Sequence, residues 1–590
     1  MMEEEKTLFE ATWDLSVYYQ GFDDPALRAD VEELRTLCAQ PLAVEGLTDV
    51  KALEAVVVRL EKVTNLMARA YGYGQLTLAA NTINRDALRL MDELSAINVD
   101  AQVLESACTR FVSTVSDLDG AIAQSEKLQS NAFILHEMKR QAAHMLPESM
   151  EKWMLRMSLS GADSYSKLRD QLMGTMTVEM DGKSYPLPAV RGMADDPDPA
   201  VRKKAYEAEL ASYRKVELPM AFCLGGIKGE ALTLCEARGY SDVLTEQLEN
   251  SRMDHETLDA MWTAIREALP DFRRYLRLKG RLLGHEDGLP FYDLSAPMGS
   301  DTRKYTIEEA RALLLDTFGK VHPAMGRFME HAFDNRWIDF YPRENKEGGA
   351  FCEENHELKI NRILTNFMGY FTDVSTLAHE LGHAWHSHCM AELPVLMAQP
   401  PMPLAETAST FNETLLAKTV IKTATPEQAF GLLEGSLMES TQVVVDIYSR
   451  FLFESAVFEA RKTHTPSADE MNQMMLDAQE QSYGDGLAKD ARHPSMWVNK
   501  SHYYMNGLHF YNFPYAFGLL FGLGVYSRFE KEGAAFVPLY DRMLADCGSD
   551  TIANVAASVG IDVHSVDYWR GALDVLRGEI AEFERLAAKR

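Results

Sequence analysis

The sequence predicts a mainly α-helical protein of two lobes with a small β-sheet. Apolar residues recur at helical spacing along most of the chain, for example in Pro25–Leu37 and Val50–Leu66. A chain of 590 residues is too long for one simple hydrophobic core, so two or more lobes are expected. β-rich runs interrupt the helical pattern in two regions, near residues 175–187 and 337–360.

The first interruption predicts a β-hairpin. Thr175–Leu187 has alternating residues on both sides of Asp181-Gly182, a dipeptide that favours a tight hairpin turn. Soon after it, the proline- and aspartate-rich run Asp195–Pro199 is typical of a helix start. We therefore expect a lobe boundary here, with an N-terminal helical lobe over 1–195 and a second domain over 196–590. Residues 284–303, rich in Gly, Pro, Asp and Ser, form a further connecting region.

The second interruption predicts a small sheet. Trp337–Tyr341, Gly349–Cys352 and Glu357–Ile360 have the composition of short strands. The pair Gly348-Gly349 allows another backbone to come close. The edge of such a sheet can hydrogen-bond an extended peptide, although a plain structural hairpin would give the same pattern.

The pentapeptide that begins at His379 and ends at His383 carries the clearest chemical signal. Two histidines four residues apart on a helix lie on one face, so both imidazoles can reach one metal ion. Glu380, next to the first histidine, can then accept a proton from a water molecule at the metal. Gly382 costs about 1 kcal/mol relative to alanine inside a helix, which predicts that something approaches the backbone closely there. The alternative is an ordinary amphipathic helix with two surface histidines.

A catalytic zinc site needs a third protein ligand. The metzincin pattern fails, because His386 occupies the position of its glycine and no histidine follows at the required spacing. The proline-rich run 391–403 must end the first helix, and a new helical pattern starts at Leu404. Glu406 and Glu413 lie seven residues apart and hence on one face of that helix. Spacing alone leaves open which of the two is the ligand, and either could be a solvated surface carboxylate.

Composition and charge exclude several classes of function. With 59 basic against 88 acidic residues, the formal charge of −29 argues against nucleic-acid binding and against an anionic membrane surface. The N-terminus is acidic where a signal peptide would be basic. The most apolar run, Phe513–Tyr526, is 14 residues long, which is too short to span a bilayer and predicts a buried helix.

The cysteines predict a reducing compartment. They are seven in number and contain no C-x-x-C pair, which is typical of reduced, mostly buried thiols in a cytoplasmic protein. Cys389, six residues after His383, could act as a soft metal ligand, but a core thiol is the favoured interpretation.

Two blocks around the pentapeptide resemble a known family. Phe371–His386 and Ala405–Glu413 are similar to the oligoendopeptidase F group of the thimet-oligopeptidase-like (M3) zinc peptidases. The similarity spans most of the chain, and further segments that resemble this group are Trp13–Leu15, Tyr292–Leu294, Tyr305–Ala310, Phe340–Cys352 and His502–Gly518.

The resemblance implies a function and a ligand set. It implies one Zn²⁺ per chain held by His379, His383 and Glu406, with Glu413 in an outer position that orients a ligand. Glu380 would be the general base in the hydrolysis of internal bonds of short oligopeptides. It also implies two helical lobes that enclose a deep active-site channel, which would admit unfolded oligopeptides and exclude folded proteins.

The resemblance further implies groups that handle the substrate. The candidates for stabilising the oxyanion are His502, Tyr511 and Tyr515, although tyrosines in an aromatic helix are often packing residues. The candidate substrate-binding edge consists of Gly348, Gly349, Ala350 and Phe351.

Two other functions remain open at this point. A carboxypeptidase or dipeptidyl carboxypeptidase on a related helical scaffold would use the same chemistry but cleave near the C-terminus of the peptide instead of at an internal bond. A helical binding protein with a structural zinc would need four protein ligands and would have no use for Glu380. Nothing in the sequence predicts whether the protein is a monomer or a homo-oligomer.

Overall fold

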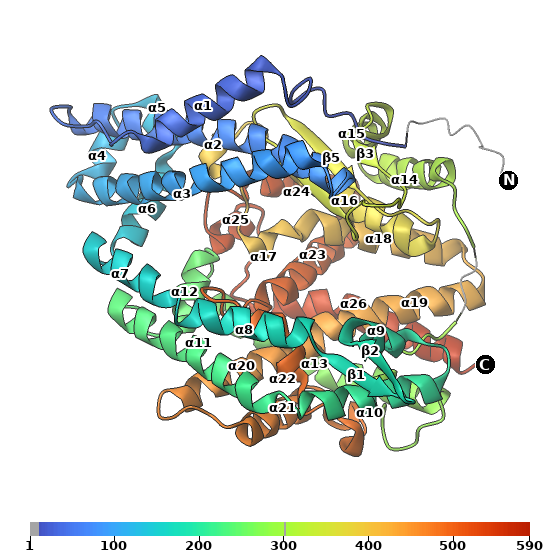
Figure 1. The fold of residues 1–590 in the computed structure, drawn as a ribbon. Coiled ribbons are helices and arrows are strands. Elements are labelled where there is room, and N and C mark those ends of the chain that lie inside the picture. The colour runs from blue at the N-terminus through green and yellow to red at the C-terminus, as the bar shows by residue number, and fades with distance from the viewer. Residues whose placement is uncertain (1–10, 300–302) are drawn as a thin grey trace. The chain divides into compact units, whose positions relative to one another are not determined.

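The computed structural model describes residues 11–299 and 303–590, and helices make up most of them. These residues pack into two compact units, each built from three stretches of chain. The first unit comprises the described parts of Met1–His144, Thr302–Val420 and Arg528–Gly560, and the second comprises those of Met145–Asp301, Ile421–Ser527 and Ile561–Arg590. The mainly α fold predicted from the sequence is confirmed (Figure 1). The division into domains 1–195 and 196–590 stays a prediction.

The first unit begins with helices that the apolar periodicity predicts. The segments expected at Pro25 and Val50 form α1 and the long helix α2. The side chain of Asp24 caps α1 by accepting a hydrogen bond from the amide of Ala26, and Pro25 occupies the first turn. The helices of this unit are α1 (Pro25–Ala39), α2 (Asp49–Ala80), α3 (Arg85–Thr114), α4 (Leu118–Ile122), α5 (Glu126–Ser130), α6 (Ala132–Ala142), α14 (Ile307–Val321), α15 (Pro323–Asp334), α16 (Phe371–Met390), α17 (Met402–Ala405), α18 (Thr407–Thr423), α24 (Val537–Asp546) and α25 (Ile552–Ser558).

A three-stranded sheet lies in the first unit, in the order β3-β5-β4. Its strands are β3 (Ile338–Asp339), β4 (Phe351–Asn355) and β5 (Ile360–Leu364). β4 pairs with β5 in antiparallel register, whereas β3 pairs with β5 in parallel. Since β5 is central, β4 is an edge strand.

The sheet lies where the sequence predicts it, but the bounds of all three strands differ, and the second runs over Phe351–Asn355 rather than Gly349–Cys352. The first is shorter than Trp337–Tyr341, and the third begins at Ile360, where the expected strand ends. Lys359 has a positive φ of 52° and its amide donates to the carbonyl of His356, so residues 356–359 form the turn between β4 and β5. The sequence predicted a strand rather than a turn here because residues 356–359 contain no glycine or proline.

The second unit contains the predicted hairpin, β1 (Thr177–Met180) and β2 (Lys183–Pro186). Asp181 and Gly182 both have positive φ, 57° and 72°, as a two-residue primed turn requires. The helices of this unit are α7 (Glu148–Ser158), α8 (Ala162–Gly174), α9 (Leu187–Gly192), α10 (Pro199–Tyr213), α11 (Glu217–Arg238), α12 (Val243–Asn250), α13 (His255–Leu282), α19 (Pro426–Thr441), α20 (Ile447–Arg461), α21 (Ala468–Ser482), α22 (Met496–Asn499), α23 (Phe513–Glu532) and α26 (Val566–Ala587). The ends of α18 and α23 cross the division between the units.

Two apolar helices, α11 and α23, are packed into the protein. Among the described helices α11 alone is long and apolar enough to cross a membrane, and 56% of that stretch is buried inside the structure. Met220, Leu224 and Ile227 of α11 belong to the hydrophobic core of the second unit. α23 contains the apolar run predicted as a buried helix, and most of Phe513–Tyr526 is buried.

Candidate metal centre

The two histidines of the pentapeptide lie on one face of α16. Asp373 caps the start of this helix by accepting hydrogen bonds from the amides of Met368 and Tyr370, at 2.9 and 2.8 Å. Leu377 and Leu381 are fully buried and fix the orientation of the helix. The Nε2 atoms of His379 and His383 lie 3.1 Å apart, one helical turn from each other.

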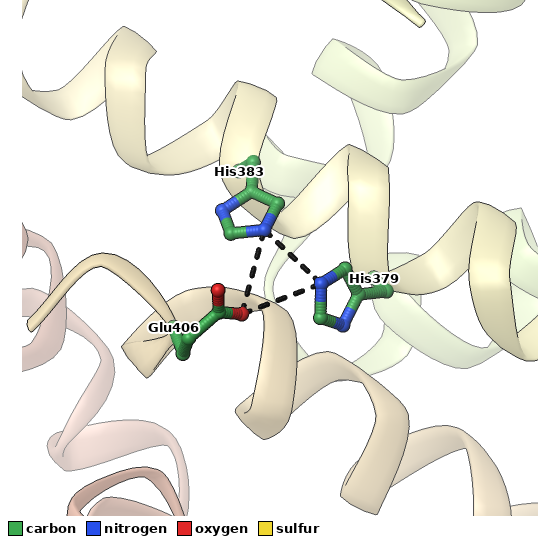
Figure 2. A group of neighbouring side chains, drawn as sticks. All are labelled: His379, His383 and Glu406. Carbon is green, nitrogen blue, oxygen red and sulfur yellow. Dashed lines mark hydrogen bonds and ion pairs between the residues drawn. The ribbon is translucent and has the colours of Figure 1, made fainter. Parts of the chain in front are cut away.

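A carboxylate completes a triangle with these histidines (Figure 2). Oε2 of Glu406 lies 3.4 Å from Nε2 of His379 and 3.5 Å from Nε2 of His383. Ligands bound to zinc at about 2.0–2.2 Å in tetrahedral geometry lie about 3.4 Å from one another. The three atoms are therefore spaced as a zinc site requires, and two imidazoles with one carboxylate form a known catalytic ligand set.

The short break between α17 and α18 orients Glu406. The sequence predicts a continuous helix from Leu404, but Glu406 ends α17 and does not enter the helix that begins at Thr407. The Ser409 hydroxyl hydrogen-bonds to Oε2 of Glu406 at 2.9 Å and to its carbonyl oxygen at 3.0 Å. Ser409 therefore holds both the side chain and the backbone of the residue.

Asn412 and Gly382 fix the distance between α16 and α18. The buried amide of Asn412 donates to the carbonyl of Ala378 at 3.0 Å. A Cβ atom on Gly382 would lie 2.7 Å from Cα of Ser409 and 2.8 Å from the carbonyl oxygen of Ala408. The close approach predicted at Gly382 is thus confirmed, since the start of α18 lies directly against it. The sequence did not predict the roles of Ser409 and Asn412. The only feature that could have indicated them was their position shortly after Glu406.

Glu413 lies on the other side of the His379 ring. Its Oε2 is 3.4 Å from Nδ1, the nitrogen that faces away from the triangle. Burial alone would lower the pKa of His379, but Glu413, with help from Glu380 and Glu406, raises it to about 9. Burial and the neighbouring His379 lower the pKa of His383 to about 4. One protonated and one neutral imidazole fit the 3.1 Å contact between them, because a hydrogen bond there needs one donor and one acceptor.

Glu380 is 5% exposed, and no lysine or arginine among the described residues pairs with it. Burial raises the pKa of Glu380 to about 7, with Glu406 and Glu413 adding to the effect and His379 opposing it. A carboxylate with a pKa near neutrality is suited to accept and return a proton.

A cavity of about 960 Å³ in the first unit opens onto this cluster. His379, Glu380, His383 and Glu406 form part of its wall. Further walls come from β4 and from one face each of α2, α3 and α6. The face of α2 follows helical spacing and consists of Leu60, Val63, Thr64, Met67, Ala68 and Tyr71. The volume is at the upper end of the range for small-ligand pockets.

The predicted substrate edge lies at and before the start of β4. Ala350 and Phe351 line the cavity, and Phe351 is the first residue of the strand. Gly348 and Gly349 precede it and are not among the described lining residues. Gly349 has a φ of 85°, and its carbonyl accepts a hydrogen bond from the Asn366 amide.

The three residues predicted to stabilise an oxyanion lie together in the second unit. The hydroxyls of Tyr511 and Tyr515 are 2.9 Å apart, and the rings of His502 and Tyr511 are 4.7 Å apart. His502 lies in the turn Ser501–Tyr504, and Tyr515 lies in the first turn of α23. Burial lowers the pKa of His502, and the cations of Arg450 and Lys500 add to this effect.

Comparison with known proteins gives the same family over most of the chain. The profile described as Peptidase family M3 matches residues 192–575, and the profile described as Oligopeptidase F matches residues 115–177. The chain is 23% identical to Oligopeptidase PepF of Bacillus subtilis over 541 residues, which cover 90% of this chain and 80% of that protein. It is 27% identical to Group B oligopeptidase PepB of Streptococcus agalactiae over 413 residues, which cover 67% of this chain and 66% of that protein.

Solved structures share the fold. A crystal structure from Chlamydophila abortus superposes with a TM-score of 0.85 at 21% identity, covering 98% of both chains. The crystal structure of oligoendopeptidase-F from Enterococcus faecium gives a TM-score of 0.69 at 18% identity, covering 96% of this chain and 98% of that one.

Proposed function

The chain belongs to peptidase family M3, and from this premise we propose that it is a zinc-dependent endopeptidase that cleaves internal bonds of short, unfolded oligopeptides. Its relatives are oligopeptidases of the oligoendopeptidase F type. The observation that carries the proposal is the triangle of His379, His383 and Glu406, whose ligand atoms lie 3.1–3.5 Å apart with Glu380 beside them.

The proposed chemistry divides between the metal and the side chains around it. His379, His383 and Glu406 would hold the zinc, which would supply Lewis-acid chemistry and lower the pKa of water from 15.7 towards about 7. Glu380 takes a proton from the attacking water and later delivers it to the leaving amine. Its pKa of about 7 supports both steps, since the group can exist in either protonation state near neutral pH. Glu413 accepts a hydrogen bond from Nδ1 of His379 and so keeps Nε2 available as a ligand.

Groups from the rest of the chain would bind the substrate and stabilise the transition state. The free edge of β4, with Gly348, Gly349, Ala350 and Phe351 at its start, would hydrogen-bond an extended peptide. The neutral donors His502, Tyr511 and Tyr515 would stabilise the oxyanion. The low pKa of His502 supports a neutral imidazole in this role.

A cytoplasmic location is part of the proposal. None of the seven cysteines, all of which lie in the part of the chain that the structure describes, forms a disulfide. Free and mostly buried thiols are typical of a reducing compartment.

A decapeptide that is acetylated at its N-terminus and amidated at its C-terminus tests the function. The zinc-loaded protein should cut it internally, a chelator should abolish cleavage, and added zinc should restore it. A carboxypeptidase or dipeptidyl carboxypeptidase would leave this peptide intact and shorten the same peptide with a free C-terminus. Mass spectrometry of the products distinguishes the two results. Intact casein should resist digestion, and its rapid breakdown would contradict the proposed restriction to short peptides.

A further inference from the structure

The wall of the cavity in the first unit carries an excess of negative charge. Among its described lining residues are five glutamates and no lysine or arginine. Glu380 and Glu406 belong to the proposed metal centre. The other three are Glu353 and Glu354 on β4 and Glu105 on α3. The proposed reaction gives these three no role.

Glu353 is the carboxylate that most needs an explanation. Side chains alternate along a strand, so Glu353 shares a face with Phe351. Phe351 packs against Trp13 and the hydrophobic core of the N-terminal helices. Glu353 thus points towards those helices and lines the same cavity as the largely apolar stripe of α2 that runs from Leu60 to Tyr71.

No cation of the described chain compensates Glu353. Arg362 lies directly across the β4–β5 pair, but its guanidinium donates to the carbonyl oxygens of Asp14 and Asn361, each at 2.7 Å. Glu353 forms no ion pair among the described residues. Burial raises the pKa of Glu353 to about 7, and its neighbour Glu354 adds to the effect. Burial also raises the pKa of Glu354, which Ser387 and His356 partly oppose.

A carboxylate without an ion-pair partner in a largely apolar wall raises the free energy of the folded protein unless a ligand supplies the positive charge. The ligand that fits both surfaces has an aliphatic stem and a cationic end. Its stem would lie on the α2 stripe, which includes Leu60, Val63 and Met67, while its cation meets Glu353. Lysine and arginine side chains have this form.

We propose that Glu353, with the charge of the neighbouring Glu354 adding to its field, makes this protein select peptides that carry a lysine or arginine side chain at one defined position near the cleaved bond. The inference rests on the proposed peptidase function and names its substrate class. A charge-assisted hydrogen bond in a partly buried site corresponds to a preference of about 10- to 100-fold.

The test uses a family of blocked peptides and the full-length, zinc-loaded chain. In each peptide a lysine at one position is replaced by norleucine, which keeps the stem and removes the charge, or by glutamate. The kcat/KM ratio of lysine to norleucine peptides should reach about 10- to 100-fold at one position, and the glutamate peptide should be the poorest. Both peptide ends are blocked, so a preference cannot come from an α-ammonium group. The same peptides with a free N-terminus are the comparison: if these gain from a cation and the blocked lysine peptides do not, the cavity wall binds the α-ammonium group and the proposal is wrong.

Glu353→Gln is the decisive variant, because it keeps the shape and removes the charge. The lysine-to-norleucine ratio should fall to near 1, whereas Glu354→Gln should lower it only in part. Glu344→Gln is the matched control, since Glu344 is exposed and outside the cavity, and it should leave the ratio unchanged. Zinc content should be equal in all three variants, because none of Glu353, Glu354 and Glu344 belongs to the proposed ligand set of His379, His383 and Glu406.

Failure of this inference is distinct from failure of the proposed function. If the zinc-loaded wild-type protein cleaves none of the peptides, the peptidase proposal fails. If it cleaves lysine and norleucine peptides equally at every position, the substrate inference fails and the peptidase proposal stands. A preference that persists in Glu353→Gln would equally overturn the assignment to this residue. The lysine-to-norleucine ratio of the wild-type protein alone decides whether the substrate preference exists, so that part of the test does not depend on the folding of a variant.

Discussion

Gly382→Ala should weaken zinc binding although alanine has the higher helix propensity. Alanine is favoured over glycine by about 1 kcal/mol in a helix interior. In this protein the added Cβ would lie 2.7 Å from Cα of Ser409, against a lower limit of 3.4 Å for ordinary contact. The start of α18 must therefore move by about 0.7 Å (3.4 minus 2.7), and such overpacking costs about 1–3 kcal/mol.

That displacement acts directly on the metal centre. Glu406 lies three residues before Ser409 and is hydrogen-bonded to it, so both move together. Metal–ligand distances tolerate only about 0.2 Å, which is less than the required shift. The bond from Asn412 to Ala378 also resists separation of the two helices. We expect zinc affinity to fall about 10- to 100-fold, as for loss of a residue that orients a ligand.

Competition with a chelator measures the zinc affinity, and denaturant unfolding of the metal-free chain measures stability. Gly435→Ala is the matched control, because Gly435 lies within α19 and nothing lies within 4 Å of its added Cβ. The control should gain up to about 1 kcal/mol and bind zinc normally. Wild-type zinc affinity in Gly382→Ala would refute the reasoning, since α18 would then have moved without disturbing Glu406.

Three further results are expected. Zinc binding at pH 7.5 should release about one proton, because His379, with a pKa of about 9, must become neutral to bind; affinity should rise with pH up to about 9. Calorimetry in two buffers of different ionisation enthalpy measures the release, and an unchanged value in Glu413→Gln would exclude the carboxylate as its cause. Ser409→Ala should lower zinc affinity about 10- to 100-fold by freeing Glu406, and a chelator titration equal to wild type would contradict this. Tyr515→Phe should reduce kcat more than it raises KM, whereas unchanged steady-state values would make the tyrosine a packing residue.

The local patterns in the sequence predicted which side chains come together around His379, because short spacings along a helix determine that cluster, while its role as a metal site stays a prediction. The four-residue spacing of His379 and His383 determines their shared face once the helix forms. The glycine between them correctly predicted a close backbone, although nothing in the sequence identified α18 as the neighbour. The choice between Glu406 and Glu413 needed the family resemblance. In the structure, the end of α17 turns Glu406 towards the triangle, while Glu413 faces the far nitrogen of His379.

The parts that the sequence did not predict depend on contacts between distant segments. The stripe of α2 from Leu60 to Tyr71 has helical periodicity, which indicates a buried face but not what that face meets. The packing of this stripe near β4 brings residues about 290 positions apart in the sequence to one cavity. The same packing makes Glu353 a half-buried carboxylate with no ion pair among the described residues, whereas in the sequence it is one acidic residue among 88 Asp and Glu. The position of Glu353 in the cavity wall, rather than its residue type, makes it a candidate substrate-binding residue.

Zinc content and turnover of Glu380→Gln together test the central claim most directly. The claim is that His379, His383 and Glu406 hold zinc while Glu380 transfers the proton. The variant should bind one zinc per chain, as the wild type should, and should lose about 10²- to 10⁴-fold in kcat on a blocked peptide. Turnover close to that of the wild type, or loss of the metal with the carboxylate, would contradict the account.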